Sequence, residues 1–257
     1  MDINCTNEEV FIFKQIGDSA EELGTPAFIV GGFVRDKILS RPTKDADIVC
    51  IGDGILLAEK TSQKFSPKPQ VNFFKNFGTA QIKIRLTPNP LSHGGEESFE
   101  IEFVGARKES YNHDSRKPDV LPGSIDEDRM RRDFTINTLS ISLNKNDFGK
   151  LIDPLNGFAD IENKIIRTPL PPDQTFIDDP LRMMRAIRFA SQLNFTISLE
   201  TFEAIKQNAG RINIVSGERI IDEINKIVMT EKPSIGFDLL YKSGLLKIIL
   251  PQMVALV

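Results

Sequence analysis

The stretch of sequence that decides the fold is Gly31-Gly32-Phe33-Val34-Arg35-Asp36, followed by Lys44-Asp45-Ala46-Asp47-Ile48-Val49. The apolar run Ala27–Val30 ends at the two glycines, which is typical of a strand that enters a tight turn before a helix. Lys44–Ile51 has the composition of a second strand. The stretch therefore predicts a strand, a helix and a second strand in succession.

The two glycines and the arginine after them are suited to a phosphate-bearing ligand. Gly31 and Gly32 let the backbone approach a ligand closely, and they open a helix whose free N–H groups and dipole favour an anion such as a triphosphate. Arg35, one turn further on, adds a positive charge. The same pattern also describes a tight strand–helix turn with a solvated arginine, so the glycine pair alone does not identify a site.

Asp45 and Asp47 lie two residues apart on the predicted strand, so both carboxylates point the same way. Like charges that close repel each other, and a bridging divalent cation removes this cost. Two such ions about 4 Å apart are the machinery of in-line phosphoryl displacement. The alternative is the polar face of an edge strand, but the apolar run Ile48–Ile51 indicates an interior strand that is buried on both faces.

A third acid comes from the strands that follow. Thr79–Leu86 and Phe99–Val104 both alternate, which predicts a hairpin with a long polar tip. Glu100 and Glu102 face away from the apolar side of the second strand. We choose Glu102 as the third carboxylate, although a solvent-facing strand has the same alternation.

A further polar set follows in Arg131-Arg132-Asp133-Phe134-Thr135-Ile136-Asn137. If this segment is helical, Asp133 and Asn137 share a face at i, i+4 with Arg132 beside them. Their donors and acceptors suit a ribose hydroxyl. A surface cluster of ion pairs explains the same residues equally well.

The sequence divides into two parts of different pattern. Residues 1–168 mix helical and strand patterns and predict an α+β domain, with helices over Glu8–Leu23 and Ile55–Phe65. After the proline-rich segment 169–172 the pattern is helical throughout, so residues 169–257 form an all-α second domain in this prediction. Its expected helices are Phe176–Leu193, Leu199–Asn208, Gly217–Met229 and Ser234–Tyr241.

Acids and arginines cluster near the start of the helical part, in Asp178-Asp179-Pro180-Leu181-Arg182-Met183-Met184-Arg185-Ala186-Ile187-Arg188. Arg182, Arg185 and Arg188 recur at i, i+3 and i+6 and so share one helix face. Asp179 and Arg182 have the spacing of an ordinary ion pair. They also suit base selection, because an aspartate accepts from the amine of C or A while an arginine donates to a ring acceptor.

Composition limits the class of protein. With 40% hydrophobic and 26% charged residues, the chain is typical of an ordinary globular protein. No apolar stretch reaches the roughly 18 residues that span a bilayer and the N-terminus lacks a basic signal region, so we expect no membrane partner and a cytoplasmic location. Two histidines are too few for a multi-histidine zinc site, so carboxylates would hold any catalytic metal, which favours Mg²⁺. A net charge of −4 argues against coating nucleic acid by bulk electrostatics but leaves room for a local basic face.

Taken in order, these motifs resemble the head and neck of the class II CCA-adding tRNA nucleotidyltransferases and the similar bacterial poly(A) polymerases. The resemblance covers nearly the whole chain and rests on five separated motifs. It implies a polymerase β-like nucleotidyltransferase head, with a mixed antiparallel sheet and flanking helices, followed by an all-helical neck. The family also has body and tail domains that grip tRNA, and this sequence stops at the apolar segment 250–257, where they should begin. Either the sequence is a fragment, as its apolar end suggests, or RNA binding is reduced.

The resemblance implies a role for each candidate residue. In the head, Gly32 and Arg35 would contact the incoming triphosphate, and Asp45 and Asp47 would bind Mg²⁺. The segment 102–109 resembles the family's third-carboxylate strand, which favours Glu102. The remaining implied roles are ribose sensing for Arg132 and Asp133, an amino-acid template for C and A in Asp179 and Arg182, and further nucleotide contacts for Arg185 and Arg188. The segment 218–224 resembles the neck helix that supports the nucleotide pocket, and a structural role is expected there.

The implied reaction transfers CMP and AMP from CTP and ATP to the 3′-hydroxyl of a tRNA or another RNA. Poly(A) addition is the nearest alternative, although Phe77-Gly78-Thr79-Ala80-Gln81 looks more like the CCA-adding enzymes. A non-catalytic RNA-binding module would have no reason to keep an uncompensated acid pair. Transfer to a small molecule such as an antibiotic is disfavoured by the Asp179 and Arg182 pair. No motif sets an oligomeric state.

Overall fold

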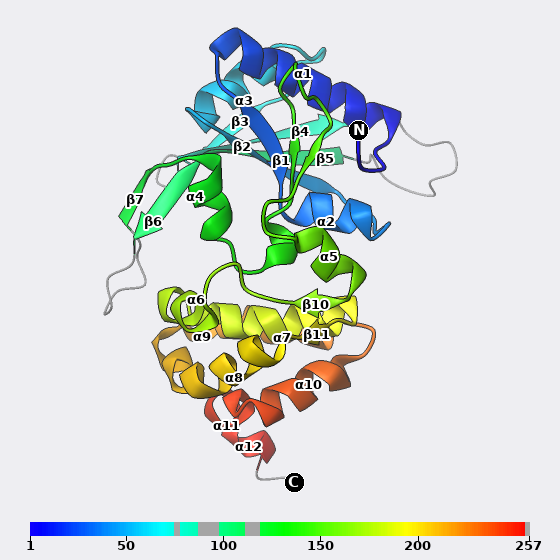
Figure 1. Cartoon of the computed structure of the whole chain (residues 1–257). Helices are drawn as coiled ribbons and strands as arrows, with labels where there is room; N and C mark the ends of the chain where they lie inside the picture. The colour runs from blue at the N-terminus through cyan, green and yellow to red at the C-terminus, as the bar shows by residue number, and fades with distance from the viewer. Residues whose placement is uncertain (75–77, 87–97, 111–118, 255–257) are drawn as a thin grey trace. The chain divides into compact units, whose positions relative to one another are not determined.

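The computed structural model describes residues 1–74, 78–86, 98–110 and 119–254, and the chain forms two compact units. The first unit comprises residues 1–108, 120–129 and 137–154, and the second comprises residues 109–119, 130–136 and 155–257. Both units are shown in Figure 1. The units interleave along the sequence, so the single domain boundary predicted at residue 168 stays a prediction.

The first unit begins with helix α1 (Asn7–Leu23), strand β1 (Ala27–Val30) and helix α2 (Gly32–Ile38), as the sequence predicted. Thr6 caps α1, because its hydroxyl accepts from the Glu9 N–H at 3.1 Å while the Glu9 carboxylate accepts from the Thr6 N–H at 2.7 Å. Gly24 ends the helix with φ 63°, a left-handed conformation that favours glycine. These local signals explain why the sequence predicted α1 within one residue of its start.

A seven-stranded mixed sheet forms the centre of this unit, in the order β3-β4-β5-β2-β1-β8-β9. Its further strands are β2 (Asp45–Cys50), β3 (Val71–Phe74), β4 (Thr79–Arg85), β5 (Ser98–Gly105), β8 (Ser140–Ser142) and β9 (Leu151–Ile152). β2 and β5 are parallel, and the other neighbours are antiparallel. The predicted hairpin is confirmed as β4 and β5, whereas its tip and Phe77 lie outside the described residues.

Helices cover one face of the sheet, whereas the other face is buried only in part. Helices α1 and α3 (Gly54–Ser62) pack on one face, where Ile82, Ile101 and Phe103 are fully buried (Figure 1). Phe13, Phe33 and Phe99 pack edge to face there, with ring centroids 5.3 to 6.1 Å apart. The opposite face is buried only in part, by an apolar cluster around Phe28, Val30, Val49 and Ala106. The uncovered part of that face is where polar side chains can meet a ligand.

The chain between β5 and β8 forms short elements. Strands β6 (Arg107–Ser110) and β7 (Asp119–Pro122) make a separate two-stranded sheet, helix α4 (Ile125–Met130) follows, and a 3-10 turn covers Thr135–Asn137. Residues 131–134 are not helical. The helical part of this segment thus ends at Met130, and the strand β8 follows the 3-10 turn.

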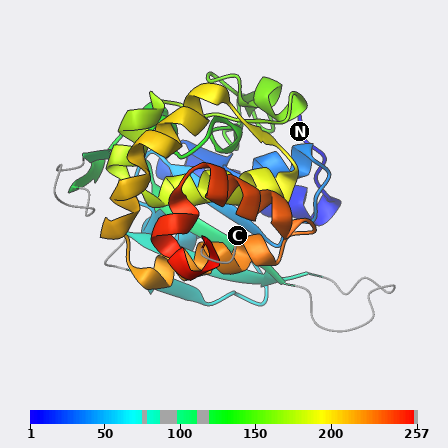
Figure 2. The ribbon, with the colours of Figure 1, turned by 90° about the horizontal axis from the view of Figure 1, so that it is seen from below.

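The second unit is mostly helical. Its elements are α5 (Gly157–Glu162), β10 (Ile165–Ile166), α6 (Pro172–Asp178), α7 (Leu181–Leu193), β11 (Thr196–Ile197), α8 (Leu199–Asn208), a 3-10 helix (Ala209–Ile214), α9 (Gly217–Val228), α10 (Pro233–Lys242), α11 (Leu245–Ile249) and α12 (Pro251–Val254). Figure 2 shows them from the side of α11 and α12. α7 packs against α9 and α10, and its residues Met183, Ala186 and Ile187 are fully buried.

Two sequence predictions for this unit were wrong. The single helix predicted over Phe176–Leu193 is broken at Asp179 and Pro180, because proline disfavours helical backbone at the preceding residue. The prediction that nothing after residue 169 is extended also fails, since β11 pairs in parallel with β10. A strand of two residues is too short to give an alternating pattern.

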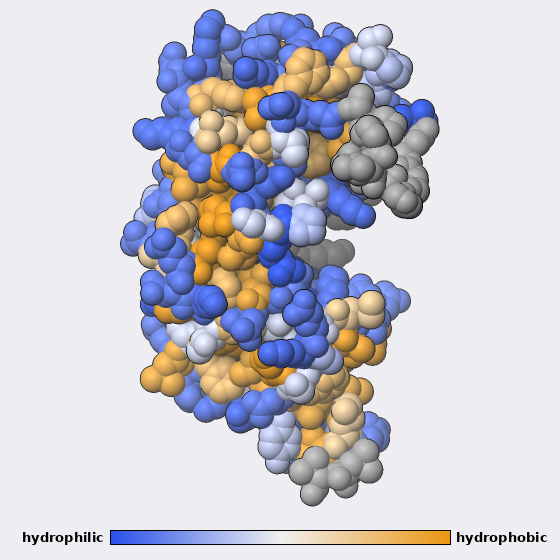
Figure 3. Space-filling model, turned by 90° about the vertical axis from the view of Figure 1, so that its right-hand side faces the viewer, coloured by the Kyte–Doolittle hydropathy of each residue, from blue (hydrophilic) through white to orange (hydrophobic). Residues whose placement is uncertain are grey.

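No helix among the described residues is long and apolar enough to cross a membrane. The face of the molecule drawn in Figure 3 carries hydrophilic residues with hydrophobic patches between them.

Candidate active site

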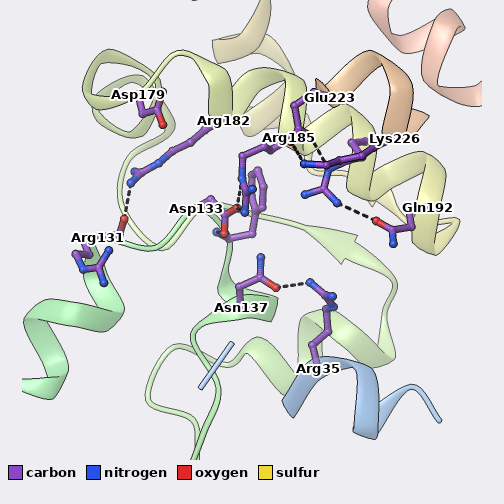
Figure 4. A network of polar contacts seen from close by, with 12 residues as sticks. Arg35, Arg131, Asp133, Asn137, Asp179, Arg182, Arg185, Gln192, Glu223 and Lys226 are labelled. Carbon is purple, nitrogen blue, oxygen red and sulfur yellow. Dashed lines mark hydrogen bonds and ion pairs between the residues drawn. The ribbon is translucent and has the colours of Figure 1, made fainter. Parts of the chain in front are cut away.

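The glycine turn of the first unit is built as the sequence predicted. Gly31 has φ 71° and ψ −128° between β1 and α2, and this positive φ favours glycine. Gly32 opens α2, and one turn later the buried Arg35 donates to Asn137 Oδ1 at 2.6 Å and to Asp36 at 2.8 and 2.9 Å. Figure 4 shows the contact between Arg35 and Asn137. Arg35 is therefore held firmly rather than solvated.

A pocket of about 400 Å³ joins the glycine turn to the acid pair. Its lining consists of Gly32, Phe33, Arg35, Asp36, Pro42, Thr43, Lys44, Asp45 and Asp47. β1 and β2 are antiparallel neighbours, with Val30 paired to Asp47, so the end of β1 brings the turn beside the aspartates. The buried hydroxyl of Thr43 has no hydrogen-bond partner among the described residues, which leaves one polar atom there available to a ligand.

The acids form rows across the uncovered face of the sheet. Asp47 pairs with Glu102 and Asp45 pairs with Glu100 across the parallel strands β2 and β5, so all four side chains lie on one face. Ala46 between the aspartates is buried on the opposite face, while both aspartates are exposed. The sequence prediction of one shared direction for Asp45 and Asp47 is thus confirmed.

Glu100 and Glu102 differ in their partners. Lys83 donates to Glu100 at 2.8 Å and Gln81 lies 3.5 Å from its other oxygen. Glu102 is exposed, and its side chain makes no hydrogen bond or ion pair with the part of the chain that the structure describes. These contacts therefore favour Glu102 over Glu100 as a candidate carboxylate ligand for a metal ion. The sequence analysis preferred the same residue.

The donor chemistry of these acids fits a hard divalent cation, which prefers oxygen ligands. Asp45, Asp47 and Glu102 offer three carboxylates on one face in adjacent register. Within the described ranges, however, no three His, Cys, Asp or Glu side chains come close enough together to form a complete metal-binding group. The strands thus place the donors on one face, while the side-chain positions do not close around an ion.

The segment that carries Arg132, Asp133 and Asn137 differs from the prediction. Because residues 131–134 are not helical, Asp133 and Asn137 do not share a helix face, and that prediction was wrong. Asn137 belongs to the first unit and contacts Arg35, whereas Asp133 belongs to the second. An i, i+4 relation exists only where the backbone is helical.

The three arginines of α7 are each held by a partner in the second unit, and Figure 4 labels two of them, Arg182 and Arg185. Arg182 donates to the Arg131 carbonyl at 2.5 Å, and Arg185 pairs with Asp133 at 2.5 Å. Arg188 pairs with the buried Glu223 at 2.6 Å and lies over the Phe189 ring. Asp133 raises the pKa of Arg185, whereas burial lowers the pKa of Arg188 against the opposing effect of Glu223.

Asp179 is not paired with Arg182. Its Oδ1 accepts from the Leu181 N–H at 3.1 Å, and its Oδ2 accepts from Arg219 of α9 at 3.2 Å. The ordinary i, i+3 ion pair considered from the sequence is therefore absent, although the Arg182 N–H bonds the Asp179 carbonyl at 3.0 Å. Both carboxylate oxygens of Asp179 are held, one by the start of α7 and the other by α9.

Residues 27–167 match the family model described as poly A polymerase head domain, and this range covers more than half of the chain. The chain belongs to the poly A polymerase head domain family. A second model, described as the probable RNA and SrmB-binding site of polymerase A, matches residues 194–256 of this family member. The resemblance stated from the sequence motifs is thereby confirmed, together with the polymerase β-like fold of the head.

Relatives of this family member are named as A-adding and CCA-adding enzymes. An A-adding tRNA nucleotidyltransferase of Aquifex aeolicus is 40% identical over 207 residues, which are 80% of this chain and 23% of that protein. A CCA-adding enzyme of Pediococcus pentosaceus is 37% identical over 220 residues, 85% of this chain and 50% of that protein. The chain thus spans about a quarter to a half of these relatives.

A solved relative has the same fold. It is a tRNA nucleotidyltransferase complexed with a primer tRNA and an incoming ATP analog, and it is 34% identical with a TM-score of 0.76. The match covers 91% of this chain and 62% of that one. The likeness therefore extends over most of this family member.

Sequence reasoning missed the contacts of Arg219. The segment 218–224 was expected to have a structural role, and no residue of it was named as a candidate for the site. Arg219 and Asp179 are 40 positions apart, and no periodicity relates residues on two different helices. The signal that the sequence offered for these contacts was the large share of charged residues on α9.

Proposed function

We propose that the chain is the catalytic portion of an RNA 3′-end nucleotidyltransferase that transfers CMP and AMP from CTP and ATP to the 3′-hydroxyl of a tRNA. The observation that carries this proposal is the single pocket that Gly32, Asp45 and Asp47 line, in a chain of this family. The names of the relatives, which include A-adding and CCA-adding enzymes, support tRNA as the acceptor. A cytoplasmic location and a head domain ending near residue 168 belong to the same proposal.

In the first unit, the glycine turn would bind the triphosphate, and the acid rows would bind the metal ions. Gly31 and Gly32 would place backbone N–H groups at the triphosphate, and Arg35, fixed by Asn137, would add a charge in a set position. Asp45, Asp47 and Glu102 would hold divalent cations, with Mg²⁺ as the ion that suits an all-oxygen donor set. When bound, such ions supply charge neutralisation at the leaving phosphates and a more nucleophilic 3′-oxygen.

In the second unit, Asp179 would accept a hydrogen bond from the exocyclic amine of C or A. Each carboxylate oxygen has two lone-pair directions, so the bonds from Leu181 and Arg219 leave acceptor positions open. An ionised carboxylate cannot donate to the carbonyl that guanine or uracil presents there. Arg182 would supply the donor to the ring acceptor, which requires its bond to the Arg131 carbonyl to be exchanged or shared.

The other polar groups of the second unit would contribute through position. Asp133 with Arg132 would sense the ribose, and Asp133 also anchors Arg185. Because Arg188 is packed against Phe189 and bound to Glu223, it would support the nucleotide pocket structurally. Arg185 would carry the positive charge nearer to the nucleotide. Both arginines are proposed as nucleotide-binding residues.

The test supplies a tRNA that ends before C-C-A with each labelled nucleotide and Mg²⁺, and reads the length and sequence of the product. Addition of C-C-A alone supports the proposal, whereas a chain that adds only the terminal A, to a second tRNA that already ends in C-C, would contradict the transfer of CMP. Long A tails would favour poly(A) addition, the alternative suggested by the description of the family model. No incorporation with any nucleotide would contradict an activity of this chain by itself.

A further inference from the structure

The uncovered face of the sheet continues beyond the acids onto strand β4. Lys83 pairs in register with Glu100, and Glu100 pairs with Asp45, so these three side chains form one row across three strands. Arg85 follows on the same face, opposite Ser98. Neighbouring strands lie about 4.8 Å apart, so the Lys83 Cα lies roughly 10 Å from the Asp45 Cα along this row.

A second pocket, of about 480 Å³, adjoins β4. Its lining comes from the segment 65–70, which includes Lys68, and from Lys83, Ile84 and Arg85 of β4. Among the described residues, the lining thus includes three basic side chains and no acidic one. We call Lys68, Lys83 and Arg85 the basic triad. A concentration of positive charge of this kind contrasts with the net charge of −4 of the whole chain.

The ion pair of Lys83 with Glu100 does not prevent this residue from binding an anion. Both side chains are about half exposed, at 58% and 42%. An exposed pair of this kind contributes little free energy because water and salt screen it. A phosphate can therefore replace Glu100 as the partner of Lys83 at small cost.

The two pockets lie on opposite sides of the acid rows. The strand order is β4-β5-β2-β1, so Asp45, Asp47 and Glu102 on β2 and β5 lie between the glycine turn that follows β1 and the basic triad around β4. In a phosphoryl displacement, the attacking and the leaving oxygen lie roughly in line on opposite sides of phosphorus. The RNA 3′-oxygen attacks the α-phosphorus of the nucleotide, and pyrophosphate departs; if the pyrophosphate leaves toward the glycine turn, the attacking strand approaches from the side of β4.

We propose that the basic triad binds the phosphodiester backbone of the RNA strand whose 3′ end is extended. The proposal rests on the proposed function, because it places the acceptor strand opposite the nucleotide. An RNA strand matches the triad in charge, and the row from Asp45 to Lys83 gives the strand a path across the face. The ligand is thus a single-stranded polyanion at the end of its chain, and the contacts are to phosphates rather than to bases.

The experiment compares two triple variants of equal charge. Lys68→Gln/Lys83→Gln/Arg85→Gln removes the triad, and Lys60→Gln/Lys64→Gln/Lys145→Gln removes three lysines of the same unit that pair with Glu22 or Glu21 on α1. The probe is a labelled single-stranded RNA of twelve nucleotides with a free 3′-hydroxyl. Its Kd is measured over a series of salt concentrations, and the KM for CTP is measured with a tRNA that ends before C-C-A.

Loss of the triad is expected to weaken RNA binding at least tenfold and to reduce the salt slope of log Kd by about 2, because each phosphate contact to a single strand contributes about 0.7. The control triple should change the Kd less than twofold, and the KM for CTP should stay within about twofold in both. A charge-conserving variant, Lys68→Arg/Lys83→Arg/Arg85→Lys, should retain the affinity, which separates loss of charge from loss of fold.

Equal RNA binding by the triad variant, the control and the unmodified chain would overturn the proposal, and so would the absence of binding in all three. A rise in the KM for CTP with an unchanged Kd for RNA would also overturn it, since the pocket would then serve the triphosphate. If RNA binding depends on the triad but no nucleotide is ever incorporated, the proposed function fails while the binding site stands.

Discussion

The acids of the sheet and the arginines of α7 are held in opposite ways. Asp45 and Glu102 are exposed, and neither side chain makes a hydrogen bond or ion pair with any residue that the structure describes. Arg185 and Arg188 each have a carboxylate partner within 2.6 Å. Exposed carboxylates that lie close together repel each other, and a bound cation removes this cost, whereas a paired arginine already contributes to the fold. The acids therefore indicate a ligand more directly than the arginines do.

The sharpest test of this comparison is Asp45→Ala. We expect nucleotide incorporation to fall by about a thousandfold or more, because a lost metal ligand removes several kcal/mol of transition-state stabilisation. Nucleotide binding should largely survive, since the glycine turn and Arg35 are unchanged. The free energy of unfolding should stay within about 0.5 kcal/mol, because the side chain is exposed. Single-turnover incorporation, nucleotide titration and urea unfolding measure the three quantities.

The control for this variant is Glu100→Ala, which removes an acid of the same row that already has Lys83 as a partner. Its incorporation rate should stay within about tenfold of the unmodified chain, that is about 1.4 kcal/mol in the barrier. Full activity of Asp45→Ala, or an equal loss in Glu100→Ala, would remove the distinction between acids with and without partners.

A second test concerns the arginines. Glu223→Ala leaves the buried Arg188 without its carboxylate, and we expect the free energy of unfolding to fall by about 3 kcal/mol or more. The matched control is Lys226→Ala, which removes the outer and half-exposed partner of the same glutamate and should cost about 1 kcal/mol or less. Urea unfolding followed by circular dichroism measures both. Equal stabilities of the two variants would mean that Arg188 is not structurally paired.

The third test concerns Asp179, which is intermediate between the exposed acids of the sheet and the paired arginines of α7. Its carboxylate is partly exposed and yet paired with Arg219. In Arg219→Gln the carboxylate keeps only the Leu181 N–H, so it can rotate away from the base. We expect the preference for CTP over UTP, expressed as the ratio of kcat/KM, to fall about tenfold, which corresponds to about 1.4 kcal/mol. The kcat for CTP should stay within about twofold, and Arg219→Lys should recover part of the preference.

Lys206→Gln serves as the control for this test, because it removes an exposed lysine paired with Glu203 on α8 and should leave the preference unchanged. A parallel fall in kcat for CTP and UTP, with the preference intact, would show that Arg219 supports the fold alone.

The comparison also explains how far the sequence could predict the site. Asp45 and Asp47 were found because alternation on a strand fixes the side to which a residue points. The alternation alone did not separate Glu102 from Glu100, and the resemblance of segment 102–109 to the family's third-carboxylate strand favoured Glu102. The register of β2 against β5 and the contact of Lys83 with Glu100 are not contained in the alternation. Four strands of the sheet, β1, β2, β4 and β5, and the hairpin of β4 with β5 were thus predictable from local pattern, whereas the parallel pairing of β2 with β5 was not.

The wrong and missed predictions also arose because local pattern does not contain the contacts between separate parts of the chain. Asp133 and Asn137 were placed on one helix because their spacing allows it, but the chain leaves the helix at Met130. Charged residues on a short segment do not specify where a helix ends unless a capping residue marks the position. Contacts between distant positions, such as that of Arg219 with Asp179, depend on packing and have no counterpart in periodicity.

The smallest effect is expected from the cysteines, and it sharpens the contrast within β2. The first half of this strand exposes Asp45 and Asp47, and its last residue is the buried Cys50. Burial raises the pKa of the Cys50 thiol to about 12 and that of Cys5 to about 11, from an ordinary value of 9.0. At pH 8 both thiols therefore stay protonated in the folded chain, and alkylation with iodoacetamide should be slow and leave incorporation unchanged.

Raising the pH should label Cys5 before Cys50, because its folded pKa is lower and its side chain is less buried. Since both pKa values are raised by folding, the unfolded chain loses these protons first, and the stability that the neutral thiols contribute declines as the pH rises above about 9. Mass spectrometry after timed alkylation at several pH values follows each thiol. Rapid labelling of Cys50 at pH 8 in the folded chain would mean that the end of β2 is accessible to solvent. The contrast between an exposed first half of the strand, with Asp45 and Asp47, and a buried second half would then not hold.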